Sequence, residues 1–248
     1  MVKILKKLYD KSPLWFALAW IIAYCVLMSV AVAVSAWIGV EKCVTLAVGV
    51  LLSAVLFLFL MKNKLLCDFG LCAPKSSLKS MLYYIPVLAM LSTNLWYGIA
   101  WNGEALKTTL YILSMLCVGF LEEVIFRGLL FGVLRHENEK VAVLVSSVTF
   151  GAGHIINLVN GSGAELLPNL LQVIYATVAG FMFVMMYVKS GSLWVPIAAH
   201  GIFNALSIFA DEAGATIERR ILTALLLTLI TGVYALYLAL TMKGKTKD

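Results

Sequence analysis

Three charged side chains stand within an apolar stretch that is long enough to cross a lipid bilayer. Residues 111–134 are predominantly apolar, yet they include Glu122, Glu123 and Arg127. An ionisable side chain at the centre of a membrane costs at least about 2.5 kcal/mol, so such residues usually mark an ion pathway or a reaction site. We therefore expect the chain to be organised around this segment, folded as a membrane-spanning helix.

Helical spacing assigns different roles to the two carboxylates. Glu123 and Arg127 lie four residues apart, which places them on one face of a helix in the favourable order for an ion pair. An arginine in hydrocarbon needs such a partner because it does not lose its proton. Glu122 is turned by about 100° from Glu123 on the same helix. The pattern predicts a supporting ion pair between Glu123 and Arg127 and leaves Glu122 available for chemistry.

The composition sets the class of protein. Hydrophobic residues make up 62% of the 248 residues and charged residues only 13%, whereas about 25% of a soluble domain is charged. We predict an all-α, polytopic integral membrane helix bundle with a single domain over residues 1–248, because no segment has the composition of a linker. The net charge of +6 does not indicate a nucleic-acid partner, because the basic residues are scattered between apolar segments.

Apolar runs predict about eight membrane-spanning helices. The first run is too long for the apolar region of a cleaved signal peptide, which is about 7–15 residues, and long enough for a span of about 20. The predicted spans cover residues 13–40, 44–61, 81–101, 106–134, 141–159, 168–188, 193–210 and 221–242. The polar motifs described below fall within a core over about residues 106–210.

Lysine and arginine residues predict the orientation of the chain in its membrane, which we expect to be a bacterial cell membrane. Cytoplasmic loops carry an excess of these residues. With eight spans, both termini share one side with Lys3, Lys6, Lys7, Lys11, Lys62, Lys64, Lys75, Lys79, Arg135, Lys140, Lys189, Lys243, Lys245 and Lys247. The opposite side holds only Lys42, Lys107, Arg219 and Arg220. We therefore expect both termini in the cytoplasm.

Two further spans carry histidine. His154 follows Phe150 by four residues, and Asn204 follows His200 by four, so each pair shares a helix face. These are two of the three histidines in the chain. Small residues at Gly151, Gly153 and Gly201 are expected to let neighbouring helices approach closely.

A carboxylate and two imidazoles, without any phosphate-binding motif, suit the activation of water for attack on an amide carbonyl. Glu122 is the candidate general base, and His154 is expected to bind or polarise the water. His200 and Asn204 are expected to donate hydrogen bonds to the oxyanion of the tetrahedral intermediate. The same Glu122, His154 and His200 could instead be zinc ligands, because two His and one Glu with an open fourth position form a common catalytic site. The sequence leaves both arrangements open.

Three ordered motifs resemble those of the CPBP intramembrane proteases, which include the type II CAAX prenyl endopeptidases and the bacterial Abi proteins. They are Glu122-Glu123-Val-Ile-Phe-Arg127, then Phe150 with His154, then His200 with Asn204. The resemblance implies an eight-helix membrane peptidase with Glu122 as the catalytic carboxylate and Glu123 and Arg127 as its supports. It also implies that His154 shares the water and that His200 and Asn204 stabilise the oxyanion.

Members of this family are described both as metalloproteases and as metal-independent glutamate proteases, so the resemblance leaves a divalent metal such as zinc as an option. It implies a membrane-associated or prenylated peptide as substrate, with membrane lipid as the surroundings. A proton-coupled transporter, or a bacteriocin-immunity factor that acts by binding, is the alternative from a different class.

Overall fold

The apolar runs of the sequence form helices that are bounded by polar capping residues. We describe a computed structural model over residues 2–101, 103–211, 213 and 215–242. The first long helix begins where the Ser12 hydroxyl accepts a hydrogen bond from the Trp15 backbone N–H, and Pro13 occupies its first turn. It ends at Gly39, whose positive φ of 79° favours glycine.

Six helices are long and apolar enough to cross a membrane, among the residues that the structure describes. They are α2 (Pro13–Ile38), α3 (Cys43–Lys62), the continuous helix Ala105–Leu134, the helix Glu139–Leu158, α8 (Leu166–Ser190) and α10 (Ile217–Met242). Helix Ala105–Leu134 comprises α5 (Ala105–Glu122), a π-helical segment η3 (Glu123–Phe131) and α6 (Gly132–Leu134). Helix Glu139–Leu158 comprises α7 (Glu139–Gly153) and a 3-10 turn η4 (His154–Leu158). The chain is an integral, all-α membrane bundle, as its composition predicted.

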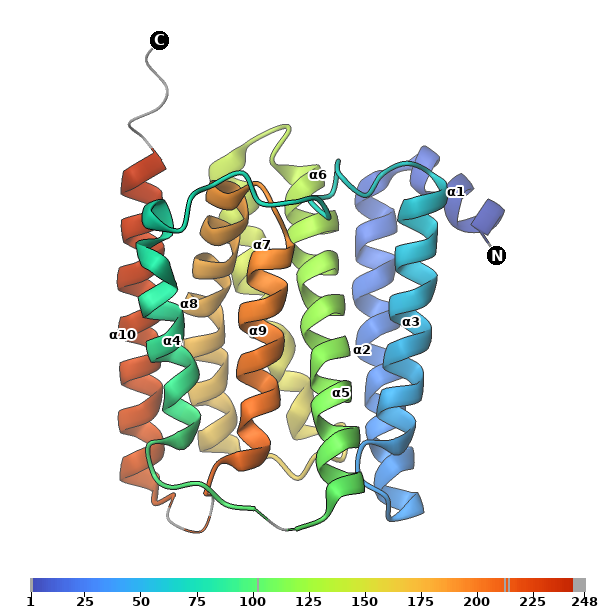
Figure 1. Ribbon diagram of the computed structural model, residues 1–248. Helices are drawn as coiled ribbons and strands as arrows, with labels where there is room; N and C mark the ends of the chain where they lie inside the picture. Colours follow the sequence, from blue (N-terminus) through green and yellow to red (C-terminus); the bar gives the residue numbers. More distant parts are fainter. Residues whose placement is uncertain (1, 102, 212, 214, 243–248) are drawn as a thin grey trace.

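Two of the eight predicted spans are shorter in the structure. The third is α4 (Ile85–Ser92), flanked by the 3-10 segments η1 (Lys79–Tyr84) and η2 (Thr93–Leu95). The seventh is α9 (Trp194–Leu206) with the 3-10 turn η5 (Ser207–Phe209). Helix α4 has 8 residues and α9 has 13, whereas a helix that spans a bilayer needs about 20. Both helices stand beside longer ones in Figure 1, and because of their length eight is an approximate count of the crossings.

The sequence did not predict a separate helix at the amino end, but α1 (Val2–Lys11) forms one. It lies at an angle to the bundle, at the end where α10 finishes (Figure 1). Leu5, Leu8 and Tyr9 pack onto the core, while Lys3 and Lys7 are exposed. This pattern is typical of an interfacial helix. The lysines of the tail beyond residue 242, which supported the predicted orientation, lie outside the described residues.

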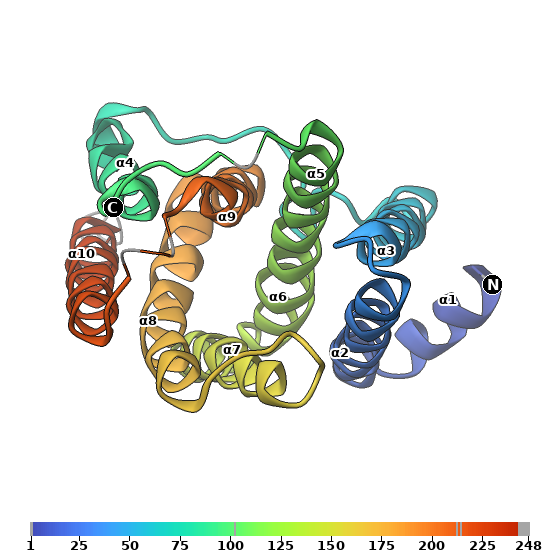
Figure 2. The same ribbon diagram turned by 90° about the horizontal axis from the view of Figure 1, so that it is seen from below.

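Four helical columns surround the centre of the bundle. Seen along the bundle in Figure 2, α5 with α6, then α7, α8 and α9 form a ring, with α4 and α10 on one side and α2 and α3 on the other. The backbones of α5 and α9 are in close contact at Gly119 and Gly201. A Cβ atom added to Gly119 would lie only 2.6 Å from the Cα of Gly201. Gly151 likewise packs closely against Thr177 of α8, as expected. At Gly153, by contrast, no neighbouring atom lies within 4 Å of the position that a Cβ atom would take.

Candidate active site

The Glu122 carboxylate lies at the last residue of α5, where the helix changes to π-helical geometry. Single π-helical turns within α-helices often occur at functional sites. The hydroxyl of Tyr24, on α2, donates a 2.6 Å hydrogen bond to Oε1 of Glu122. The other oxygen, Oε2, has no hydrogen-bond partner among the described residues. One carboxylate oxygen is therefore fixed by Tyr24, and the other is a buried acceptor that no described residue satisfies with a hydrogen bond.

Glu123 and Arg127 form the predicted ion pair, and both side chains are fully buried. Nη1 of Arg127 donates a 3.0 Å hydrogen bond to Oε1 of Glu123. Nη2 of Arg127 is 3.4 Å from the Gly180 carbonyl oxygen of α8, so the guanidinium also joins two helices. The pair holds one helix against another in a setting where an unpaired charge would be costly.

His200 bridges the two glutamates. Its Nδ1 lies 2.8 Å from Oε1 of Glu123, and its Nε2 lies 3.5 Å from Oε2 of Glu122. A carboxylate paired with Arg127 accepts hydrogen bonds, so Nδ1 of His200 carries the proton and Nε2 faces Glu122. Glu123 is thus more than a partner for Arg127, because it also sets the orientation of the His200 ring.

Two phenyl rings enclose this charged cluster. Phe183 of α8 stacks on His200 with ring centroids 5.0 Å apart. Phe150 of α7 meets the rings of both His200 and His154 edge to face, at 5.5 and 5.2 Å. The guanidinium carbon of Arg127 lies 4.0 Å from the centre of the Phe150 ring, within range of a cation–π contact. These rings limit the motion of the polar groups and keep water from the ion pair.

His154 lies at the end of α7, where the helix tightens into η4. Its Nδ1 is 3.1 Å from the carbonyl oxygen of Phe150. Because a carbonyl only accepts, this contact places the proton on Nδ1 and leaves Nε2 as the nitrogen available to a ligand. The Asn169 amide donates a 2.9 Å hydrogen bond to the backbone carbonyl of His154, which fixes the helix end against α8.

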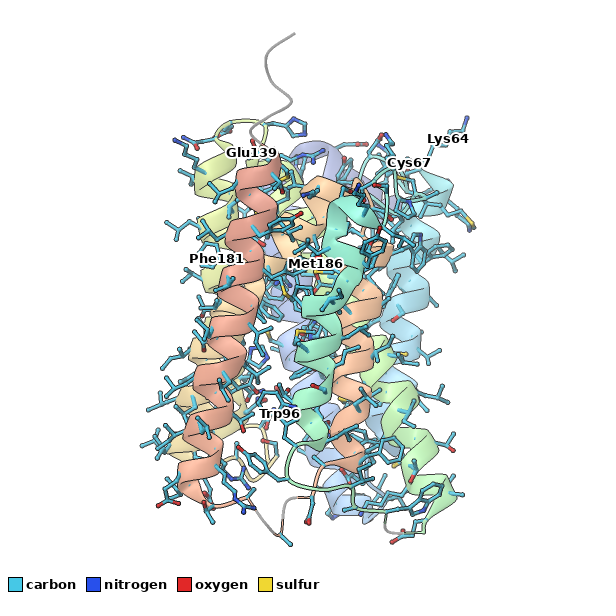
Figure 3. The ribbon with its side chains drawn as sticks, turned by 60° about the vertical axis from the view of Figure 1, so that its left-hand side comes forward. Lys64, Cys67, Trp96, Glu139, Phe181 and Met186 are labelled. Carbon is cyan, nitrogen blue, oxygen red and sulfur yellow. The ribbon has the colours of Figure 1, made fainter. Side chains whose placement is uncertain are left out.

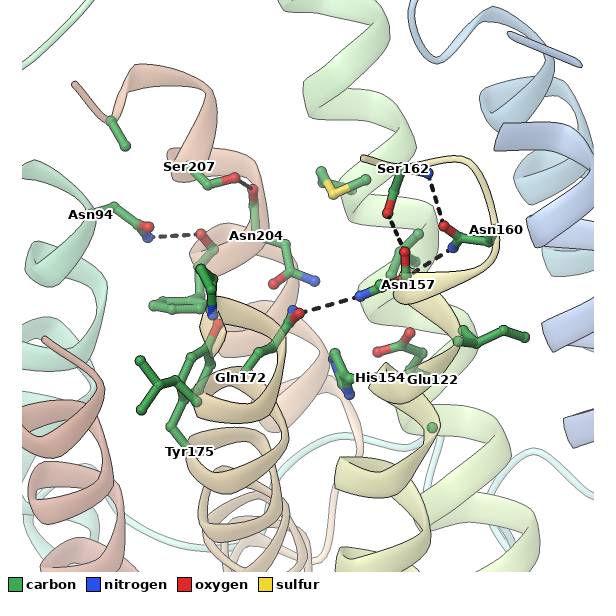
Figure 4. A pocket seen from close by; sticks show the side chains of 18 of the residues that line it. Asn94, Glu122, His154, Asn157, Asn160, Ser162, Gln172, Tyr175, Asn204 and Ser207 are labelled. Carbon is green, nitrogen blue, oxygen red and sulfur yellow. Dashed lines mark hydrogen bonds between the residues drawn. The ribbon is translucent and has the colours of Figure 1, made fainter. Parts of the chain in front are cut away.

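A cavity of about 550 Å³ contains Glu122, His154 and Asn204 in its wall. Figure 4 shows Glu122 and His154 beside each other, with the Asn204 amide across the cavity from them. The Asn204 side chain makes no hydrogen bond to another described residue, and it also borders a smaller cavity of about 50 Å³ that reaches His200. The structure therefore brings the four predicted catalytic side chains to one site.

The zinc alternative needs Glu122, His154 and His200 as a joint ligand set. Oε2 of Glu122 and Nε2 of His200 lie 3.5 Å apart. Within the described part of the chain, however, no three His, Cys, Asp or Glu side chains are arranged to hold a metal ion. In this structure the three side chains are therefore not arranged as ligands of one metal ion. The metal-dependent arrangement stays a prediction.

Sequence reasoning missed three contributors to this site. Tyr24, Gly180 and Phe183 lie far from the three motifs in sequence, and each reaches the charged cluster only through helix packing. Tyr24 did carry a weak signal, since a tyrosine within an apolar span needs a partner for its hydroxyl. Its partner could not be identified without the fold.

Comparisons with known proteins agree with the three motifs. Residues 104–206 match the family model described as "Type II CAAX prenyl endopeptidase Rce1-like". The chain is also 34% identical over 98 residues to the Bacillus subtilis (strain 168) protein named "Putative membrane peptidase YdiL". That match covers 39% of this chain and 35% of the relative, so the chain spans about a third of the relative's length. No solved structure matches the chain.

Proposed function

We propose that this chain is an intramembrane endopeptidase of the CAAX-protease family, because residues 104–206 match the family model and 98 residues resemble a protein named as a membrane peptidase. Its substrate would be a membrane-associated or prenylated peptide. The observation that carries the proposal is the arrangement of Glu122, with Oε1 held by Tyr24 and with Oε2 free of hydrogen bonds to described residues, 3.5 Å from Nε2 of His200. The carboxylate borders a cavity that also contains His154.

In the proposed reaction, a water molecule donates hydrogen bonds to Oε2 of Glu122 and Nε2 of His154. Glu122 accepts a proton as the water oxygen attacks the carbonyl carbon of the scissile bond. The tetrahedral intermediate then breaks its C–N bond, and the proton held by Glu122 passes to the leaving amine. Water is consumed, and a carboxylic acid and an amine are released, so atoms and charge balance.

The oxyanion of the intermediate would be stabilised from α9. The amide N–H of Asn204 borders the cavity, and a protonated His200 would donate from Nε2. The Glu123 carboxylate accepts from Nδ1 of His200 and so holds the ring in place. Removing one such donor in other enzymes costs roughly 100- to 1,000-fold in rate. The fully buried Arg127 would hold Glu123 in place.

The test is mass spectrometry of a pooled library of prenylated and unprenylated membrane peptides, incubated with the purified protein in detergent. The matched control is Glu122→Gln, which keeps the shape of the side chain and removes the base. Cleavage by the wild type alone is expected. Equal cleavage by both proteins would contradict the proposal, and cleavage by neither would favour a transport or immunity role.

A chelator arm of the same assay separates the two chemistries. A glutamate protease should retain its rate in 1,10-phenanthroline. Loss of activity that zinc restores would assign Glu122, His154 and His200 to a metal site instead.

A further inference from the structure

We infer that the cavity at Glu122 opens on the extracytoplasmic side of the membrane and receives peptide segments already exposed outside the cytoplasm. The opening itself is a property of the structure. That a peptide enters it rests on the proposed function.

The cavity extends from the charged cluster to the bundle end opposite α1. Its outer wall is formed by the loops between helices at that end: Lys42 between α2 and α3, Tyr97 between α4 and α5, Asn160 and Ser162 between α7 and α8, and Asp211 between α9 and α10. Ser162 is exposed to solvent. The same end is the lower one in Figure 1. Four separate loops thus form one mouth.

No residue in the cavity wall comes from the loops at the α1 end, in the part of the chain that the structure describes. That end is filled by packed side chains instead. Phe131 of η3 and Tyr187 of α8 are buried there, with ring centroids 6.0 Å apart. The segment after α3 crosses the same end, where the backbone N–H of Leu193 donates a 2.7 Å hydrogen bond to the Gly70 carbonyl. This packing closes the ring of helices between the site and the end of the bundle where α1 lies.

The site lies about midway along the bundle. Tyr24 is eleven residues after Pro13, the first residue of α2, which corresponds to about 16 Å at 1.5 Å per residue. The helix has 26 residues and is therefore about 39 Å long. A peptide can thus reach Glu122 through the mouth without crossing the whole bundle.

Basic residues distinguish the two ends of the bundle. The closed end carries Lys3, Lys6, Lys7, Lys11, Lys62, Lys64, Lys75, Lys79, Arg135, Lys140 and Lys189, and Figure 3 shows Lys64 there, with Trp96 towards the opposite end. The open end carries Lys42, Lys107, Arg219 and Arg220. Lysine and arginine in short loops favour the cytoplasm. The closed end therefore faces the cytoplasm and the mouth faces away from it.

The chemistry of the wall suits an extended peptide. The Asn157 amide donates to Oε1 of Gln172 at 3.2 Å, and the Asn160 amide donates to Oδ1 of Asn157 at 3.2 Å (Figure 4). Carboxamides both donate and accept, so this row can exchange its internal hydrogen bonds for bonds to a peptide backbone. The substrate class that follows is a membrane-anchored peptide whose cleavable segment has already crossed the membrane.

Native cysteines at the two ends provide the test. Cys67 is exposed in the loop after α3, at the closed end, as Figure 3 shows. Burial raises the pKa of its neighbour Cys72, so Cys67 is the faster reporter. Ser162→Cys places a thiol at the mouth. Intact cells that express the full-length chain would be treated with a membrane-impermeant maleimide, and the modified peptides would be mapped by mass spectrometry.

We expect the thiol at position 162 to be modified in intact cells, and Cys67 only after permeabilisation. Cys43 is a native, half-buried cysteine beside Lys42 at the open end. It should also be modified in intact cells, and so it checks the result without any substitution. Labelling of Cys67 in intact cells, alone or together with position 162, would overturn the inference. The labelling does not depend on cleavage, so failure of this inference and failure of the proposed peptidase are separate results.

Discussion

The hydroxyl of Tyr24 and the carboxylate of Glu122 are 2.6 Å apart, although the two residues are separated by 98 positions in sequence. Tyr24 lies on α2, outside the segment that matches the family model. The amino-terminal helices therefore contribute directly to the site and do more than anchor it in the membrane.

Tyr24→Phe should lower kcat by about 10- to 100-fold with little change in KM. A hydrogen bond to a charged group contributes about 1.5–3 kcal/mol, and here it fixes the carboxylate that would activate water. Tyr175→Phe is the matched control, because Tyr175 lines the same cavity and its hydroxyl makes no hydrogen bond to a described residue. Equal losses in the two variants, measured by peptide cleavage, would show that Tyr24 has no positioning role.

Glu123→Gln or Arg127→Met should destabilise the protein by about 3–5 kcal/mol, because each leaves an uncompensated buried charge. The double variant should be less destabilised than the sum of the two single variants. Thermal unfolding in detergent measures all three. Wild-type melting of either single variant would contradict a supporting role for this pair.

Gly119→Ala should cost about 1–3 kcal/mol of stability, because overpacking forces backbones apart. The new Cβ would lie 2.6 Å from the Cα of Gly201, a backbone atom that cannot move alone. Gly153→Ala serves as the control, since nothing lies within 4 Å of its Cβ position. A higher or equal melting temperature for Gly119→Ala would show that α5 and α9 do not depend on this contact.

Asn204→Ala should lower kcat by about 100-fold, the loss expected for one oxyanion donor. Asn157→Ala removes an amide from the outer wall of the same cavity and should raise KM instead. Steady-state kinetics on one cleavable peptide distinguishes the two effects. A KM effect from Asn204→Ala, with kcat intact, would place this residue in substrate binding and not in the chemistry.

The sequence predicted those features that depend on short-range spacing. Apolar length located the helices, and the four-residue separation of Glu123 and Arg127 predicted their ion pair, which persists within the π-helical segment. The contacts of Tyr24 and Phe183 depend on which helices become neighbours and at what rotation, and spacing within one helix carries no such information. The double contact of His200 with both glutamates was missed for the same reason.

The aromatic packing at the α1 end also affects whether protons can leak across the membrane. A hydrolytic site within a membrane needs water, yet a continuous column of water through the bundle would dissipate the proton gradient across that membrane. The buried rings of Phe131 and Tyr187 interrupt such a column between the site and the cytoplasmic face that we infer. Water is thereby admitted to the site from one side, while the membrane keeps its electrical insulation.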